Sequence, residues 1–318
     1  QKYFEWPLLF RDVISVQPPS SAEQEELLLT REDHQHLLRH NGFHIFRNAI
    51  PADEARDLAK FVKAGYGVEE MDLFTRADIV NQVPELTKYI HDPRIVERVK
   101  MCVGGDVCFV QQSDFHANYV AHGWHRDSAN REFGTGRDWD ESEAPYQVVK
   151  AMFYLEGQDI ALAILPRSHR MNVPPTDNWP DFNSYQVLPR ANVLEAPLYE
   201  DGNVHPILVE GGPGDLLVFD IRLLHGGRVL DPVYAQLHEQ LAHPKSQVAI
   251  VYGTDNIHSR RFYSYTRFVR EDMGYQNVGE HDLALLKEHS LLLPHMNENL
   301  FDTAPQEAEG IVEFKPNE

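Results

Sequence analysis

The chain has 318 residues, of which 42% are hydrophobic and 25% charged, ordinary values for a folded globular protein with a sizeable core. Its formal net charge is −20, with 49 acidic against 29 basic side chains, and this charge would repel nucleic acid phosphates and anionic lipid headgroups. We therefore expect a small-molecule substrate, neutral or cationic, and no nucleic acid or membrane partner.

The two cysteines, Cys102 and Cys108, are too few for a disulfide framework or a thiolate metal site. This scarcity favours a reducing, cytoplasmic location. No stretch approaches the roughly 18 apolar residues that a membrane-spanning helix needs. Because the chain begins with Gln1 rather than Met, removal of a leader stays open, and the sequence sets no oligomeric state.

The first third of the chain, residues 1–105, is expected to be mainly helical. After an irregular lead-in, Thr30 is suited to cap a helix that ends at Asn41-Gly42, and a strand follows over 43–46. Apolar periodicity then predicts two further helices, one that starts after Pro51 and ends near Gly65, and one over about 93–104.

The middle of the chain, residues 106–270, changes to a period of two and predicts strands separated by turns. Many short strands on one continuous stretch are typical of a closed antiparallel architecture. We predict an all-β core with peripheral helices, in the form of a double-stranded β-helix, also called a jelly roll or cupin-like fold. The expected strands are 108–111, 115–120, 146–155, 160–165, 207–209, 216–219 and 248–252.

Three segments, 128–145, 171–204 and 228–245, resist a regular assignment. Loops of this length in a compact domain are commonly lids or binding loops, so we expect them around the mouth of a site. Residues 271–302 are expected to be helical and 303–318 to form a loose tail. The whole chain, 1–318, is interpreted as a single domain.

The strongest chemical signal is the combination of His125, Asp127 and the distant His225. Residues two apart in a strand point the same way, so His125 and Asp127 can reach one ion together, and His225 would come from a neighbouring strand. Two imidazoles and one carboxylate on one face are the usual cradle of a non-haem Fe(II) that keeps open positions for other ligands. Chance could produce such a pair, but both parts follow predicted strands.

These residues and their flanks resemble the phytanoyl-CoA dioxygenase-type family of Fe(II)/2-oxoglutarate oxygenases. The helix before Asn41-Gly42-Phe43 resembles the family's helical opening, and residues 123–127 resemble its metal motif. Residues 165–170 are similar to its Pro-Gly-Ser-His turn, and 214–227 to its distal-histidine strand. The resemblance implies that His125, Asp127 and His225 bind Fe(II) and that 2-oxoglutarate and O2 are co-substrates.

Two departures from the family pattern bear on the site. Arg167 stands where the family's turn has glycine. The family also has an arginine near the start of the last strand that binds the far carboxylate of 2-oxoglutarate, and Lys245 stands at the matching place if 228–245 is an insertion. Lysine is a point charge rather than a bidentate fork. The candidates for binding 2-oxoglutarate are therefore Lys245, Gln111, Lys150 and Arg228.

The function that follows is an Fe(II)/2-oxoglutarate-dependent dioxygenase that oxidises, by hydroxylation above all, a small or medium-sized metabolite and releases succinate and CO2. Asp127 favours hydroxylation, desaturation or another oxidative rearrangement over halogenation, because halogenating relatives lack that carboxylate. Two alternatives stay open, namely a non-catalytic jelly-roll binding protein and a cupin-like metalloenzyme that does not use 2-oxoglutarate. The sequence does not identify the substrate.

Overall fold

The structure is a computed structural model of the chain. It describes residues 29–69, 74–118, 124–156, 160–172, 186–188, 207–226, 245–270 and 280–294, together with residues 275, 296 and 300.

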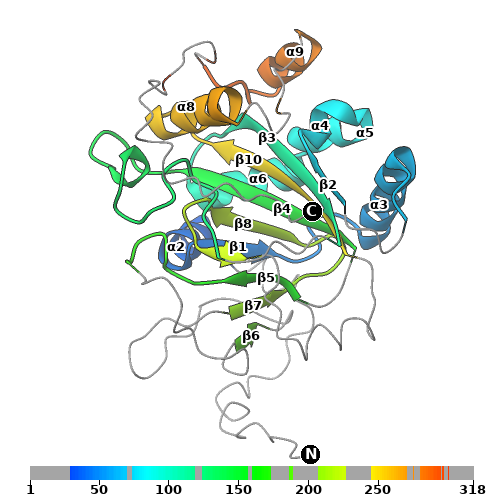
Figure 1. Ribbon diagram of the computed structural model, residues 1–318, viewed down its shortest axis with the longest axis horizontal. Helices are drawn as coiled ribbons and strands as arrows, with labels where there is room; N and C mark the ends of the chain where they lie inside the picture. The colour runs from blue at the N-terminus through cyan, green and yellow to red at the C-terminus, as the bar shows by residue number, and fades with distance from the viewer. Residues whose placement is uncertain are drawn as a thin grey trace, which may run out of the picture.

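The larger of two β-sheets has six strands in the order β1-β8-β4-β10-β3-β2, and every pairing between them is antiparallel. Strand β10 is central and pairs with both β3 and β4 (Figure 1). The bounds are β1 Phe43–Phe46, β2 Phe74–Ala77, β3 Cys108–Ala117, β4 Val148–Glu156, β8 Leu216–Asp220 and β10 Ser246–Gly253.

The smaller sheet has four strands in the order β6-β7-β5-β9. A buried apolar cluster joins the two sheets, because it contains Phe219 and Met152 from the larger sheet and Ile164 and Val209 from the smaller one. This two-sheet core, antiparallel except for the parallel pair β6–β7, confirms the predicted jelly roll. The strands of the smaller sheet are β5 Ile160–Ile164, β6 Gln186–Leu188, β7 Ile207–Glu210 and β9 His225–Gly226.

Helices cover the other face of the larger sheet (Figure 1). The first begins at Thr30, whose side chain accepts from the Asp33 backbone while the Asp33 carboxylate accepts from the Thr30 backbone, a reciprocal cap. Apolar stripes on these helices pack against the outward side chains of β3, β4, β8 and β10. Their bounds are α2 Arg31–Asn41, α3 Ala52–Tyr66, α4 Ile79–Gln82, α5 Pro84–Thr87, η2 Lys88–Ile90 and α6 Pro93–Val103.

Several elements differ from the sequence-based expectations. Helix α3 continues past Gly65 and ends at Gly67, which has a left-handed backbone. Strand β3 is a single strand that contains a bulge, whereas two strands, 108–111 and 115–120, were expected there. Strand β2 and helices α4 and α5 are short elements that the periodicity did not reveal, since four residues are too few to establish a period.

The region after β10 also differs from the expectation of strands to residue 270. It forms α8 Ile257–Ser264, followed by a π-helical turn, η5 Tyr265–Val269. Asn256 caps α8 by accepting from the backbones of His258 and Ser259, a start signal that the sequence contained. The C-terminal helix α9, Glu280–Glu288, is close to the predicted one.

The segment 128–145 is irregular as predicted, apart from the short helix η3 Arg137–Trp139. Strand β6 lies within 171–204, which was expected to be irregular throughout. Most of 171–204, nearly all of 228–245 and the tail from residue 303 lie outside the described residues. Among the helices that are described, none is long and apolar enough to cross a bilayer.

Candidate metal centre

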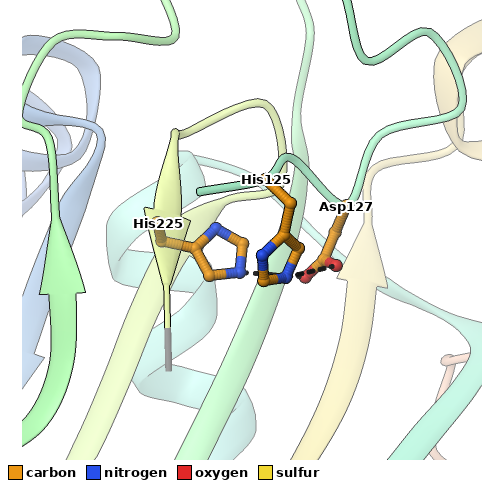
Figure 2. A group of neighbouring side chains, drawn as sticks. All are labelled: His125, Asp127 and His225. Carbon is orange, nitrogen blue, oxygen red and sulfur yellow. Dashed lines mark ion pairs between the residues drawn. The ribbon is translucent and has the colours of Figure 1, made fainter. Parts of the chain in front are cut away.

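The structure brings His125, Asp127 and His225 together at one end of the barrel. Asp127 Oδ1 lies 3.8 Å from His125 Nε2, and Asp127 Oδ2 lies 3.5 Å from His225 Nε2. One ligand atom from each of the three residues lies within 4.8 Å of the other two. Figure 2 shows both imidazole rings and the carboxylate turned toward one another.

Backbone pairing places these side chains. The His125 N–H donates to the His225 carbonyl at 2.9 Å, and the His225 N–H donates back at 3.0 Å, so the two residues form an isolated antiparallel bridge. Two residues on, the Asp127 N–H donates to the Ile221 carbonyl at 2.9 Å. Three backbone hydrogen bonds thus hold together two segments that lie about a hundred residues apart in the sequence.

The hydrogen bonding of His225 defines which of its nitrogens faces the cluster. Its Nδ1 lies 2.8 Å from the Leu223 carbonyl oxygen, and because a carbonyl only accepts, Nδ1 must carry the proton. In the neutral ring, Nε2 then presents a lone pair on the side of Asp127. This is the arrangement by which a second partner orients a metal-binding histidine.

The three residues fit a first-row divalent metal. Ligands at right angles, each about 2.1 Å from such an ion, lie about 3 Å apart, so the observed 3.5 and 3.8 Å need a small rotation of the side chains to close on one ion. Asp127 Oδ2 is buried and accepts no hydrogen bond. Lys150 Nζ forms an ion pair with that oxygen at 2.6 Å.

Electrostatics keep Asp127 ionised. Burial alone would raise the pKa of this carboxyl group, but the positive charge of Lys150 and the imidazoles of His225 and His125 together hold the pKa well below its usual value. The side chain of His125 is 33% exposed, whereas those of Asp127 and His225 are 11% and 5% exposed. Approach from solvent is therefore on the His125 side.

Comparison with known proteins now identifies the family. The sequence profile described as "Phytanoyl-CoA dioxygenase (PhyH)" matches residues 38–229, which is more than half of the chain and includes all three residues of the cluster. The chain belongs to the PhyH family. It is therefore a non-haem iron oxygenase that uses 2-oxoglutarate and O2 as co-substrates and acts on small-molecule substrates.

Solved structures of similar fold include three enzymes at low identity. HygX from Streptomyces hygroscopicus, with nickel and 2-oxoglutarate bound, is 17% identical over 71% of this chain and 87% of its own, with a TM-score of 0.49. EctD from S. alaskensis with bound Fe is 17% identical over 71% and 77%, with a TM-score of 0.47. The epimerase SnoN, in complex with Fe3+, alpha ketoglutarate and nogalamycin RO, is 15% identical over 71% and 84%, with a TM-score of 0.47.

No curated protein matches the chain. The similarity to the solved structures concerns the fold alone.

Within this PhyH-family protein, Arg126 holds the metal segment from behind. Its Nε and two terminal nitrogens donate to the carbonyl oxygens of Arg222, Arg131 and Ser168 at 2.9, 3.1 and 3.2 Å. Burial lowers the pKa of Arg126. A guanidinium that satisfies three carbonyls joins the segment of His125 and Asp127 to the turn before His225.

Trp139 packs between two arginines rather than lining the metal site. The guanidinium carbons of Arg126 and Arg222 each lie 5.4 Å from its ring centroid. Arg222 also pairs with Asp220 and with Glu141, both at 2.8 Å. Trp139 therefore helps to fix the loop 128–145 beside the metal segment.

The turn that resembles the family's Pro-Gly-Ser-His motif supports the distal histidine. Ser168 Oγ accepts from the Leu224 backbone at 2.7 Å, next to His225. Arg167 has φ +66°, the left-handed region that glycine occupies without strain, which explains the family's preference. Gly42 lies close by, and a Cβ there would stand 2.5 Å from Leu223 and 2.6 Å from His169.

The spacing of Gln111, Ser113 and Phe115 by two in a strand predicts that all three line the barrel, and for two of them this prediction is wrong. On both sides of the bulge at Gln111, where φ is +59°, the odd-numbered side chains of β3 lie on the helix face of the larger sheet, since Phe109 and Phe115 belong to the same cluster. Ser113 Oγ accepts from Val80 of α4, and Phe115 packs in the cluster under the helices.

The side chains of β3 that turn toward the metal end include Asp114 and Gln112. Asp114 Oδ2 lies 3.9 Å from Lys150 Nζ, and Gln112 Nε2 lies 3.4 Å from the same oxygen. Gln111 is buried, and neither its amide oxygen nor its amide nitrogen has a partner. Alternation alone does not say which face of a strand is turned toward the helices, so the sequence could not assign these residues to a face.

The basic candidates for the co-substrate occupy different places. Lys150 contacts Asp127. Lys245 directly precedes β10, where its backbone N–H donates to Asn118 Oδ1 at 2.9 Å. The charges acting on His116 come from Asp114, Lys150, Asp127 and Lys245, so His116 lies within range of both lysines. Arg228 lies outside the described residues.

Two polar residues near the site had no signal in the sequence. Tyr275 donates to Asp114 Oδ1 at 2.6 Å and accepts from Gln112 Nε2 at 3.1 Å. It comes from beyond the strands and outside the family match. Its partner Asp114 sits in a strand where an acidic residue normally indicates a solvent-facing position.

Proposed function

We propose that this protein hydroxylates a small or medium-sized metabolite, with 2-oxoglutarate converted to succinate and CO2. The observation that carries the proposal is the convergence of His125, Asp127 and His225, with Nε2 of His225 left available by the bond from Nδ1 to Leu223. Fe(II) bound there supplies the oxidising chemistry. The presence of Asp127 favours hydroxylation over halogenation.

In this proposal, the protein's part is binding, orientation and exclusion of water. His125, Asp127 and His225 hold the metal on one face and leave the opposite positions for co-substrates. The Phe219 ring packs edge-on against His225 at 4.8 Å between centroids and keeps that side of the centre dry. The partly exposed His125 marks the open side, where the substrate would enter.

We assign the far carboxylate of 2-oxoglutarate to Lys245. Its position at the start of the central strand β10 and its reach to His116 support this assignment. Lys150 is a weaker candidate because its ammonium group is already engaged by two carboxylates. Gln111, with both amide atoms unpaired, is retained as a hydrogen-bonding residue for the co-substrate or substrate.

The test of the metal assignment is spectroscopic. Fe(II) and 2-oxoglutarate added to the protein without O2 should produce a weak visible charge-transfer band that the His225→Ala variant lacks. Absence of the band, with no binding of either component, would overturn the proposal. Succinate formation with a library of metabolites excludes a purely binding role, and metal analysis of the purified protein tests for a cupin-like enzyme with another metal.

The test of the anchor is a lysine series. Lys245→Met should raise the dissociation constant of 2-oxoglutarate about 100-fold, since a buried charge-assisted contact contributes roughly 1.5–3 kcal/mol, whereas Lys245→Arg should stay near wild type. Arg260→Met is the control, because Arg260 pairs with Asp255 on the surface. An unchanged constant in Lys245→Met would transfer the role to another cation.

The chain-level expectations accompany this proposal. We propose one oxygenase domain over residues 1–318 and a cytoplasmic setting, favoured by the presence of only two cysteines in the sequence. The net charge of −20 supports the absence of nucleic acid and membrane partners.

A further inference from the structure

Lys150 lies at the metal end of the barrel in contact with a residue that the proposed metal uses. Its Nζ is 2.6 Å from Asp127 Oδ2 and 3.9 Å from Asp114 Oδ2. The side chains of Lys150, Asp114 and Asp127 are only 10%, 10% and 11% exposed. One buried ammonium group therefore balances two buried carboxylates, one of which belongs to the metal cluster.

The two oxygens of Asp127 are used differently. Oδ2 lies 2.6 Å from Lys150 Nζ and 3.5 Å from His225 Nε2, whereas Oδ1 lies 3.8 Å from His125 Nε2 and has no cation beside it. A carboxylate can bind a metal through one oxygen or through both. With a cation beside Oδ2, coordination through Oδ1 alone costs the least electrostatic energy.

Asp114, the second carboxylate beside Lys150, is itself held in place by hydrogen bonds. Asp114 is held by the Tyr275 hydroxyl at 2.6 Å, and Gln112 Nε2 donates to that hydroxyl at 3.1 Å. Tyr275 lies beyond the family match, which ends at residue 229. A contact chain thus runs from the C-terminal part of the protein through Asp114 and Lys150 to Asp127.

We propose that Lys150 is a positioning residue that engages Oδ2 of Asp127 and restricts this carboxylate to a single metal bond, with Asp114 and Tyr275 setting its place. The inference rests on the proposed metal site. It has a chemical purpose there, because a carboxylate bound through both oxygens would take a coordination position that a chelating co-substrate and O2 require. The ammonium also repels a divalent cation and keeps its binding weaker than the three ligands alone would give.

The first experiment measures Co(II) binding to the metal-free, full-length protein. Lys150→Met removes a positive charge near the ion and should lower the dissociation constant at least about tenfold. Lys63→Met is the matched control, since Lys63 is also buried and paired with a carboxylate, Glu156, at 2.5 Å. Co(II) affinity should not change in that variant. Equal or weaker Co(II) binding by Lys150→Met would overturn the proposal.

The second readout is the visible absorption of bound Co(II), which responds to coordination number. Lys150→Met should change the spectrum as Asp127 gains a second bond, and Lys150→Arg should restore the wild-type spectrum. An identical spectrum in Lys150→Met and wild type contradicts single-oxygen coordination set by Lys150. If wild type and His225→Ala bind Co(II) alike, the metal site itself is wrong, which is a distinguishable failure.

A milder pair of variants guards against misfolding. Tyr275→Phe removes the hydroxyl that holds Asp114, lets Asp114 draw Lys150 away from Asp127, and should tighten Co(II) binding about threefold. Tyr154→Phe is the control, because that hydroxyl is buried without a partner. Similar effects of the two variants on Co(II) affinity would remove Tyr275 from the proposal.

Discussion

Asp215, which joins a turn to the larger sheet, differs from the buried polar groups at the metal end of the barrel in how fully its oxygens are hydrogen-bonded. Both oxygens of Asp215 are bonded, Oδ1 by the Asn48 backbone and Oδ2 by Arg47 and the Gly212 backbone, at 2.8 to 3.0 Å. At the metal end, Asp127 Oδ2, both amide atoms of Gln111 and the amide oxygen of Gln112 accept or donate no hydrogen bond.

This difference separates groups that stabilise the fold from groups that await a ligand. An unsatisfied buried polar atom costs about 1–3 kcal/mol, and such costs persist where function requires them. Satisfied pairs remote from the metal should therefore govern stability and leave metal binding alone. Groups at the metal end should instead affect metal binding and contribute little to stability.

The largest effect on stability is expected from Asp215→Ala. The change leaves the buried Arg47 guanidinium and two backbone N–H groups without their acceptor, so unfolding in urea should show a loss of about 4 kcal/mol. Co(II) affinity of the folded protein should be unaltered. Asp57→Ala, which removes an exposed partner of Lys60, should leave stability unchanged; a loss in both variants would break the comparison.

Lys63→Met should follow, with a loss of about 3 kcal/mol in the free energy of unfolding. Glu156 would remain buried with only the Ser246 hydroxyl as a donor, at 2.7 Å. Denaturant titration measures the loss. A variant as stable as wild type would show that this ion pair on the helix side does not contribute to the stability of the fold.

Lowering the pH should reduce the free energy of unfolding, because His44, which is buried on the helix side, binds a proton more readily in the unfolded chain. Burial lowers the pKa of His44 to about 3, helped by the charges of His34 and Arg47. Because the unfolded chain binds this proton near pH 6.5, the stability is fully present above that pH and is lost as pH falls toward 3. The expected loss is about 2 kcal/mol between pH 6.5 and 5. His44→Phe should show a shallower dependence in urea unfolding, and an equal slope would reject His44 as the source.

The smallest effect has the opposite sign and concerns Gln111. Replacing its unpaired amide with an apolar chain of similar length, Gln111→Met, should raise the free energy of unfolding by about 1 kcal/mol. Gln112→Met should lower it, because Gln112 Nε2 donates to Tyr275. Thermal denaturation of the two variants measures both changes. Destabilisation by Gln111→Met would mean that the Gln111 amide stabilises the fold.

Much of the architecture followed from local patterns. The cap at Thr30, the stop at Gly42 and the alternation in β4, β8 and β10 are properties of short segments, so the sequence predicted these elements. The spacing of His125 and Asp127 and the flanks of His225 predicted which residues would meet. Those inferences rest on side-chain chemistry and period, which a linear sequence contains.

Tertiary structure decided the rest of the metal centre. Helix packing determined that Ser113 and Phe115 of β3 face away from the metal end, and the fold brought Lys150, Asp114 and Tyr275 into contact from separate parts of the chain. Contacts of this kind depend on strand register and on the path of distant segments, and neither leaves a local pattern. The sequence by itself therefore predicted the candidate metal ligands and the fold class, while the folded chain determined the charges that surround these residues.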